Sequence, residues 1–337
     1  DILITTPESL YLMLTSAARE TLTGVQTIIV DEVHAADAYM RRYLARVLEW
    51  LGSYGTPVIL LSATLPPDHL DDLTAAYARG KRGELTLGGG RAAYPRLTVQ
   101  TSTIRQLHVP WTGAVTEVDL VPVSSDLDAL VSRVSADVEA GGCAVVIRNT
   151  VRRAQETYAA LVAVLGRDRV VLLHSQFVAS DRAAKERDVV SRLGPPGPGV
   201  DRPEGFVVVG TQVLEQSLDI DADVMETDHA PVDLLLQRIG RLHRHQRAHE
   251  QGDRPASLRR AKVRVMGSPS TSEVPNLDRG SEAVYGTYPL LSSAAVLAPH
   301  AAGKPLRLPD DIPTLVESAY DEQLAPPQAW ESAWEEA

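Results

Sequence analysis

Residues 25–40 read VQTIIVDEVHAADAYM, and this stretch decides the fold class. A short apolar run ends at two carboxylates, Asp31 and Glu32, and His34 follows one residue later. Such a run predicts a buried strand with polar side chains at its carboxyl end. The same arrangement recurs in five further stretches, which begin at residues 1, 57, 143, 169 and 205: DILITT, PVILLSAT, CAVVIRNT, RVVLLHSQ and GFVVVGTQ.

Continuous apolar strands that alternate with helical patterns are typical of parallel sheets covered by helices on both faces. The sequence therefore predicts an α/β fold of the doubly wound class. Ligands of such sheets bind beyond the carboxyl ends of the strands, where every polar tail of this sequence falls. We expect a first domain over 1–95, an interdomain crossover with a strand or two over 96–120, a second domain over 121–265, and the start of an accessory region over 266–337.

Composition limits the classes of function. The chain has 337 residues, of which 44% are hydrophobic, which suits about two globular domains. A net charge of −11 argues against a protein that coats nucleic acid by bulk electrostatics, so any nucleic-acid path must be local, such as the basic segment 238–264. The single Cys143 excludes a disulfide framework. No run approaches the ~18 apolar residues of a membrane helix, so we expect a cytoplasmic protein without membrane contact.

The acidic strand end carries the first chemical signal. At the carboxyl end of a strand, one of the pair Asp31 and Glu32 can hold a divalent cation through water, and the other can accept a proton. This division of labour activates water against a phosphoanhydride. Ser62 and Thr64, at the end of the next apolar run, offer hydroxyls that can hydrogen-bond a neighbouring histidine or acid. The alternative is an ordinary acidic loop.

Two stretches of the second block carry further candidates. Thr211 and Gln212, at a strand end, can hydrogen-bond a nucleic-acid backbone without reading its sequence, and Asp219 can hold a ribose hydroxyl or an arginine. Ordinary strand and cap polarity is the alternative. In QRIGRLHRH, arginines recur every three residues at 238, 241 and 244, which predicts one helical face. These arginines are either solvated and ion-paired, or fingers that neutralise a γ-phosphate.

In order, TTPES, DEVHA, SATLP, HSQF, GTQVLEQSLDID and QRIGRLHRH resemble motifs Ib to VI of superfamily 2 helicases. That family has two RecA-like domains that enclose ATP. From Asp37 onward the sequence most resembles the type I CRISPR-associated helicase-nuclease, which the Cascade complex recruits. The resemblance covers about residues 31–330, with EQSLDI and GRLHRH as its most specific parts.

The resemblance implies a role for each matched residue. Asp31 would bind water-coordinated Mg²⁺, Glu32 would position and deprotonate the attacking water, and His34 would couple to Ser62 and Thr64. The remaining implied residues are Asp219, Gln237 and Arg238 for ATP, Arg241 and Arg244 as fingers, and Thr6, Glu8, Thr150, Thr211 and Gln212 along a single-stranded DNA path. The family moves 3′ to 5′ on the displaced strand and degrades it with a separate histidine-aspartate nuclease domain.

The sequence departs from this family in three ways. It contains no G-x-x-x-x-G-K-[ST] phosphate loop, since Lys81 and Lys304, the lysines that follow glycine, precede Arg and Pro. It contains no histidine-aspartate nuclease block. We therefore expect a piece of a longer protein, with an incomplete first RecA-like domain, that is inactive alone.

The third departure concerns residues 1–34, which resemble Lhr-type repair helicases, above all in TTPESLYLML. Because both families share DEVHA, we hypothesise a junction there, either a natural recombinant or an assembly join. Two alternatives to the CRISPR helicase follow: a fragment of an Lhr-type helicase, and a non-catalytic remnant that binds single-stranded DNA.

Overall fold

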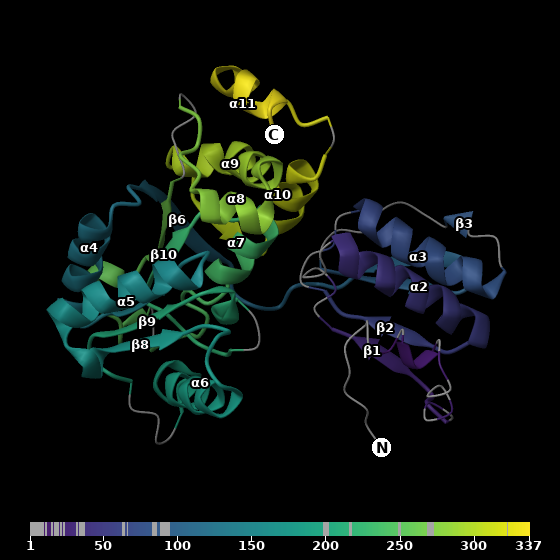
Figure 1. Ribbon diagram of the computed structural model, residues 1–337, viewed down its shortest axis with the longest axis horizontal. Coiled ribbons are helices and arrows are strands. Elements are labelled where there is room, and N and C mark those ends of the chain that lie inside the picture. Colours follow the sequence, from purple (N-terminus) through teal and green to yellow (C-terminus); the bar gives the residue numbers. More distant parts are fainter. Residues whose placement is uncertain are drawn as a thin grey trace. The chain divides into compact units, whose positions relative to one another are not determined.

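The computed structural model describes residues 10, 12–14, 16, 20, 22, 24–31, 33, 38–62, 65, 67–82, 86–87, 95–197, 202–215, 218–248, 251–267, 273–321 and 323–337. The chain divides into two compact units, Asp1–Gly113 and Ala114–Ala337 (Figure 1).

The first unit contains a parallel pair of short strands, β1 (Ile28–Val30) and β2 (Val58–Leu60), with Val30 opposite Leu60. Two of the predicted apolar runs therefore form neighbouring strands. Helix α2 (Ala38–Tyr54) follows β1, and helix α3 (Pro67–Lys81) follows β2. Leu44, Leu48 and Leu73 of these helices form a core with the inner strand residues.

Only one face of this strand pair is covered, although the apolar runs predicted cover on both faces. Ile29 is 62% exposed and Ile59 is 47% exposed. Both point away from the face that α2 and α3 bury, because strand side chains alternate. The prediction of two covered faces is thus wrong for the described part of this unit.

Helices α2 and α3 lie in close contact, and a glycine from each makes the contact possible. A Cβ atom on Gly80 would lie 1.8 Å from the backbone oxygen of Glu49, and one on Gly52 would lie 2.2 Å from that of Tyr77. A three-stranded sheet of order β3-β5-β4 also belongs to the first unit. Its strands are β3 (Thr86–Leu87), β4 (Arg96–Gln100) and β5 (Thr103–His108).

The second unit is built on a seven-stranded sheet of order β12-β6-β11-β10-β7-β9-β8. All neighbours are parallel except β12, which is antiparallel to β6. The strands are β6 (Thr116–Val123), β7 (Cys143–Ile147), β8 (Val170–Leu173), β9 (Phe206–Gly210), β10 (Val224–Asp228), β11 (Ala261–Met266) and β12 (Leu306–Leu308). The runs that begin at residues 143, 169 and 205 are therefore strands, as predicted.

Both faces of this sheet are covered, which confirms the doubly wound α/β prediction. Val145 and Ile147 of β7 lie in one apolar cluster, and Ala144 and Val146 lie in the cluster on the opposite face. Figure 1 shows the helices that surround the sheet. They are α4 (Leu127–Glu139), α5 (Val151–Leu165), α6 (Ala179–Leu193), α7 (Val232–Ile239), α8 (Arg279–Tyr285), α9 (Thr287–Ala301), α10 (Ile312–Ala319) and α11 (Glu331–Glu335).

The segment after residue 266 is part of the second unit. Strand β12 extends the sheet, and α9 and α10 contribute Leu297 and Leu315 to its core. The domain limits drawn from the sequence stay predictions. Among the helices of the described residues, none is long and apolar enough to span a membrane.

Candidate functional site

The acidic strand end of the first unit brings two predicted residues to neighbouring positions. Asp31 follows β1 and Ser62 lies just past β2, and both are exposed. Backbone hydrogen bonds join the two strand ends, from Leu61 N to Val30 O at 2.8 Å and from Val33 N to Leu61 O at 3.1 Å. The remaining candidates of this unit lie outside the described residues: Thr6, Glu8, Glu32, His34 and Thr64.

The carboxyl edge of the seven-stranded sheet gathers three further candidates. Thr150 follows β7 and Thr211 follows β9, and these strands pair with Ile147 opposite Gly210. Thr150 caps α5, where its side chain accepts a hydrogen bond from a backbone N–H. Gln212 donates to the backbone oxygen of Asn149 at 2.9 Å. The structure thus brings Thr150, Thr211 and Gln212 together, with Thr211 only 2% exposed.

Arg238 is completely buried. Its guanidinium donates two hydrogen bonds to one carboxylate oxygen of Glu215, at 2.8 and 2.6 Å, and further ones to the Oγ1 of Thr227 at 2.7 Å and the Oδ1 of Asn149 at 2.9 Å. A fourth partner, the Tyr285 hydroxyl, lies at 3.0 Å. These contacts tie α7 to four other parts of the unit, so here Arg238 acts as a structural cation. Its contact with ATP stays a prediction.

The three arginines do not share a helical face, so that prediction is wrong. Helix α7 ends at Ile239 with Gly240 as its cap, and only Arg238 lies within it. After the cap, Leu242 forms an isolated β-bridge with Ala222, and the backbone of His243 has a φ of +49°. The chain therefore leaves the helix before the second arginine, with the left-handed backbone at His243 rather than at Gly240.

Arg244 and Asp219 form an exposed ion pair. The Arg244 Nε donates to the Asp219 Oδ1 at 2.6 Å, and the two side chains are 39% and 45% exposed. His245 Nε2 lies 2.9 Å from the same oxygen. Although partial burial opposes it, hydrogen bonds from Arg244 and His245 hold the pKa of Asp219 below its usual value. This pair thus holds the predicted finger Arg244 beside the predicted nucleotide ligand Asp219.

Gln237 and Arg241 lie close to this pair in sequence. Arg241 donates to the backbone oxygen of Glu215 at 2.8 Å. The Nε2 of Gln237 is buried and has no hydrogen-bond partner. A buried donor without a partner costs free energy unless a ligand accepts its hydrogen bond. Gln237 is therefore compatible with the phosphate contact that the sequence predicts for it.

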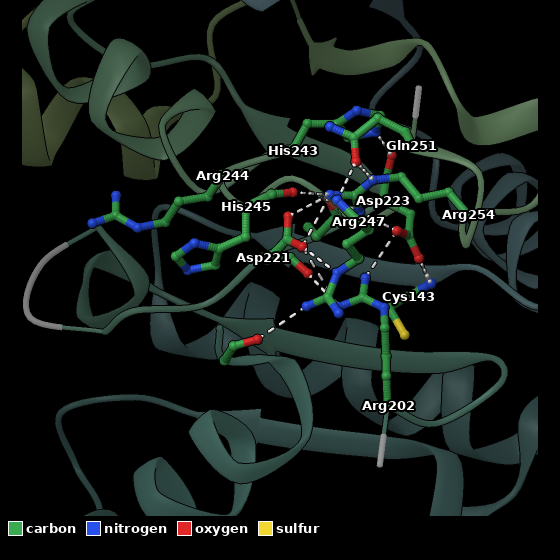
Figure 2. A network of polar contacts seen from close by, with 12 residues as sticks. Cys143, Arg202, Asp221, Asp223, His243, Arg244, His245, Arg247, Gln251 and Arg254 are labelled. Atoms are coloured by element: carbon green, nitrogen blue, oxygen red, sulfur yellow. Dashed lines mark hydrogen bonds and ion pairs between the residues drawn. The ribbon is translucent and has the colours of Figure 1, made fainter. Parts of the chain in front are cut away.

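A second ion-pair network fixes the loop that follows Arg244, and Figure 2 shows it. Asp221 and Asp223 accept hydrogen bonds from three buried or half-buried arginines. Arg254 donates both to Asp221, at 2.8 and 2.9 Å, and to Asp223. Arg247 contacts Asp221 at 2.5 Å, and Arg202 contacts Asp223 at 2.9 Å. Two carboxylates shared by three guanidiniums leave the network with a net positive charge.

This network lies at the amino end of the sheet, because Asp223 also accepts from the backbone N–H of Cys143, the first residue of β7, at 2.7 Å. Arg254 further donates to the backbone oxygen of His245 at 3.1 Å. Figure 2 shows the Arg244 side chain directed away from the network. The network thus holds the backbone next to Arg244 while leaving its guanidinium at the surface.

Sequence reasoning missed the partners that hold these arginines. Glu215 lies within the quoted EQSLDID, and Asn149 lies two residues past β7, in the polar tail of the quoted CAVVIRNT. Asp221 and Asp223 form a D-x-D pattern just before an apolar run, which was the available signal for paired buried carboxylates. Within the described part of the chain, no cluster of three His, Cys, Asp or Glu residues suits a metal ion, and the Mg²⁺ contact of Asp31 stays a prediction.

Comparisons with known proteins find similarity to CRISPR-associated helicases over most of the chain. Residues 140–247 match the family described as "CRISPR-associated nuclease/helicase Cas3, C-terminal", and residues 1–73 match "DEAD/DEAH box helicase". A CRISPR-associated nuclease/helicase Cas3 from Streptococcus thermophilus is 38% identical over 89% of this chain and 31% of its own length. The chain thus spans about a third of that curated relative.

Solved structures agree. The crystal structure of T. fusca Cas3-AMPPNP matches with a TM-score of 0.75 and 32% identity over 92% of this chain and 37% of that one. A chain of a CRISPR RNA-guided surveillance complex, pre-nicking, matches with a TM-score of 0.73 and 31% identity over 91% of this chain and 39% of its own. An Lhr helicase/probable uracil glycosylase from Mycolicibacterium smegmatis matches only a short segment, at 63% identity over 20% of this chain and 5% of its own length.

Proposed function

The chain belongs to the Cas3 family of CRISPR-associated nuclease/helicases, and we propose that it forms the helicase portion of such a protein. In this proposal the protein couples ATP hydrolysis to 3′-to-5′ movement on DNA and unwinds the DNA for degradation. Its recruiting partner is a Cascade-type ribonucleoprotein, supported by the similarity to a chain of a surveillance complex. This activity is that of a cytoplasmic protein.

The observation that carries the proposal is that Arg238 and Arg244, both in the segment QRIGRLHRH, differ in burial. Arg238 is built into the core, whereas Arg244 is presented at the surface by a loop whose backbone is fixed. If Arg244 served only to stabilise the fold, its loop would not need to hold the guanidinium at the surface. This arrangement suits a finger that senses phosphate, because a planar guanidinium on a fixed backbone segment can turn to phosphate oxygens and bind them through paired hydrogen bonds.

In this proposal, residues of both units would act on ATP with Mg²⁺. Bound Mg·ATP would supply the phosphoanhydride whose cleavage drives movement. Asp31 would hold the ion through water, and Glu32 would orient and deprotonate the attacking water. Ser62 lies just past β2, the strand that pairs with β1. Together with Thr64 and His34 it would couple ATP hydrolysis to the rest of the unit.

The second unit would contribute the charge that stabilises the transferred phosphate. Arg241 and Arg244 would neutralise it, and the orphan amide of Gln237 would donate to a phosphate oxygen. Asp219 would contact the sugar once Arg244 turns to the nucleotide.

The same proposal assigns the carboxyl-edge residues of the second unit to the DNA backbone. Thr150, Thr211 and Gln212 lie together on adjacent strand ends. They carry no positive charge, so they would position the strand rather than supply affinity. Thr6 and Glu8 complete the proposed path.

We further propose that these 337 residues alone neither hydrolyse ATP at an appreciable rate nor cut DNA. The sequence lacks a phosphate loop and a histidine-aspartate nuclease block. Strong DNA-stimulated ATP hydrolysis by the purified polypeptide would contradict this part of the proposal.

The experiment that tests the helicase role measures coupling between nucleotide and DNA. Fluorescence anisotropy of a labelled 20-nucleotide single strand is titrated with the protein, with and without Mg·AMPPNP. We expect a clear change of DNA affinity with nucleotide in the wild type, and loss of that change in Arg244→Gln, with DNA binding retained. Arg260→Gln is the matched control, because Arg260 also forms an exposed ion pair, with Asp119 at 2.6 Å.

One alternative has its own observation. The missing phosphate loop favours a non-catalytic remnant that binds single-stranded DNA. In that case the affinity for the strand is the same with and without Mg·AMPPNP, and Arg244→Gln has no effect on it. The Lhr-type reading rests on the short matched segment alone.

A further inference from the structure

A pocket of about 410 Å³ lies in the first unit between α2 and α3. Apolar side chains form part of its wall, among them Val33 and Leu65, which follow β1 and β2. The polar part of the lining comes from the two helices and comprises Arg41, Arg42, His69, Asp72 and Arg79. All of these residues belong to one unit, so the pocket does not depend on the second unit.

The lining has an excess of positive charge. Three guanidiniums face one carboxylate, Asp72, in a chain whose net charge is −11. Salt bridges found among the described residues include none for Arg41, Arg42 or Arg79. Three cations around one hollow, with Asp72 as the carboxylate of the lining, give it an excess of positive charge that an anion can balance.

Arg41 shows the clearest sign of an absent partner. One of its terminal nitrogens hydrogen-bonds the Nε2 of His69, and its Nε is buried without a hydrogen-bond partner. Burial, and then the charge of Arg41, lower the pKa of His69. The imidazole therefore accepts from Arg41 as a neutral group and adds no negative charge beside it.

We propose that this pocket binds a small phosphate-bearing organic molecule. The planar forks of Arg41 and Arg42 suit the oxygens of a phosphate group, and the apolar wall suits an organic body. The volume falls within the roughly 300–1,000 Å³ of small-ligand pockets. A nucleic-acid backbone is a poorer fit, because it would need a continuous groove. The proposal does not rest on the helicase role, which uses other residues.

The test is calorimetric titration of the 337-residue chain with phenyl phosphate, which combines a phosphate group with an apolar ring. We expect binding that is at least about tenfold tighter than that of phenol, since charge-assisted hydrogen bonds are each worth a tenfold change or more. The double substitution Arg41→Gln and Arg42→Gln weakens it by about the same factor. Arg46→Gln, on the same helix but paired with Glu49, leaves it unchanged.

A second variant tests the pocket by shape. Ala45→Trp places a ring into the hollow from its wall, so phenyl phosphate binding is lost while the circular dichroism spectrum is kept. Arg244→Gln keeps phenyl phosphate binding, which separates this site from the proposed nucleotide residues.

Three results would overturn the proposal. They are equal binding of phenyl phosphate by the wild type and by the Arg41/Arg42 double variant, phenol binding as tightly as phenyl phosphate, and displacement of phenyl phosphate by oligothymidylate. The last result would place a nucleic-acid backbone in the pocket instead of a small molecule.

Discussion

Replacement of Arg238 by Met should destabilise the second unit far more than replacement of Arg244. Arg238 is completely buried, and Glu215, its carboxylate partner, is 4% exposed. The substitution removes the guanidinium and leaves Glu215 as a buried charge without its cation. Breaking such a pair from one side costs about 3–5 kcal/mol, which is a large part of the roughly 5–15 kcal/mol that stabilises a folded domain.

The surface pair gives the contrast. Arg244 and Asp219 are 39% and 45% exposed, so Arg244→Met should cost no more than about 1 kcal/mol. For a unit of this size, each kcal/mol moves the melting temperature by about 2–4 °C. Arg238→Met should therefore melt roughly 10 °C below the wild type, and Arg244→Met within about 4 °C of it.

Urea unfolding, followed by circular dichroism, measures both variants. The double variant Arg238→Met with Glu215→Leu removes both charges, and it should recover part of the lost free energy of unfolding because no unpaired charge stays buried. Equal midpoints for Arg238→Met and Arg244→Met would refute the reasoning. So would a double variant no more stable than Arg238→Met alone.

Three further predictions concern burial. Cys143 is fully buried and burial raises the pKa of its thiol to about 11, so iodoacetamide at pH 8 should label it only after unfolding. Burial lowers the pKa of His229 and His243 to about 4, so the unfolded state binds protons first as pH falls below 6.5. The free energy of unfolding should then drop by about 2 kcal/mol for each histidine between pH 7 and 5. Leu14 is 4% exposed, so Leu14→Ala should lower the free energy of unfolding by about 2–5 kcal/mol.

Each of these predictions has a control. Leu12 is 62% exposed, so Leu12→Ala should leave the free energy of unfolding nearly unchanged. Urea titrations at several pH values measure the histidine effect, and Gln in place of both His229 and His243 should flatten it. Rapid labelling of native Cys143 would contradict its burial, and equal unfolding free energies at pH 7 and 5 would contradict the histidine argument.

Two strands could be identified from the sequence because strands buried on both faces are mostly apolar, although the equally buried β10, VMETD, carries three polar residues. CAVVIRNT and GFVVVGTQ met that rule, and β7 and β9 are fully buried. The antiparallel β12 escaped it, since its short segment LRL lies at a sheet edge with one side chain exposed. Edge strands need not be apolar, so composition gives little sign of them.

The site was harder to predict than the fold, because ion pairing depends on distances that only the folded chain sets. Thr150 and Thr211 both follow apolar runs, and they lie close together because neighbouring parallel strands end at one edge. The spacing of Arg238 and Arg244 could not show that one is buried and the other exposed. That difference comes from Gly240, which ends the helix between them, and from Glu215, whose contact depends on the fold of residues far from α7.

The hypothesised junction at DEVHA joins an Lhr-like segment to the rest of the chain, and side chains from both sides of it pack together. Leu10 and Leu14, from the Lhr-like segment, form one apolar cluster with Val47 and Leu51 of α2, which lie beyond the junction. Apolar packing depends on volume more than on exact identity, so two related helicases can exchange this segment and keep a common core. Loss of stability in Leu14→Ala would show that both segments share that core. Amplification of genomic DNA across the codons of residues 20–50 then separates a natural recombinant, which gives a product, from an assembly join, which gives none.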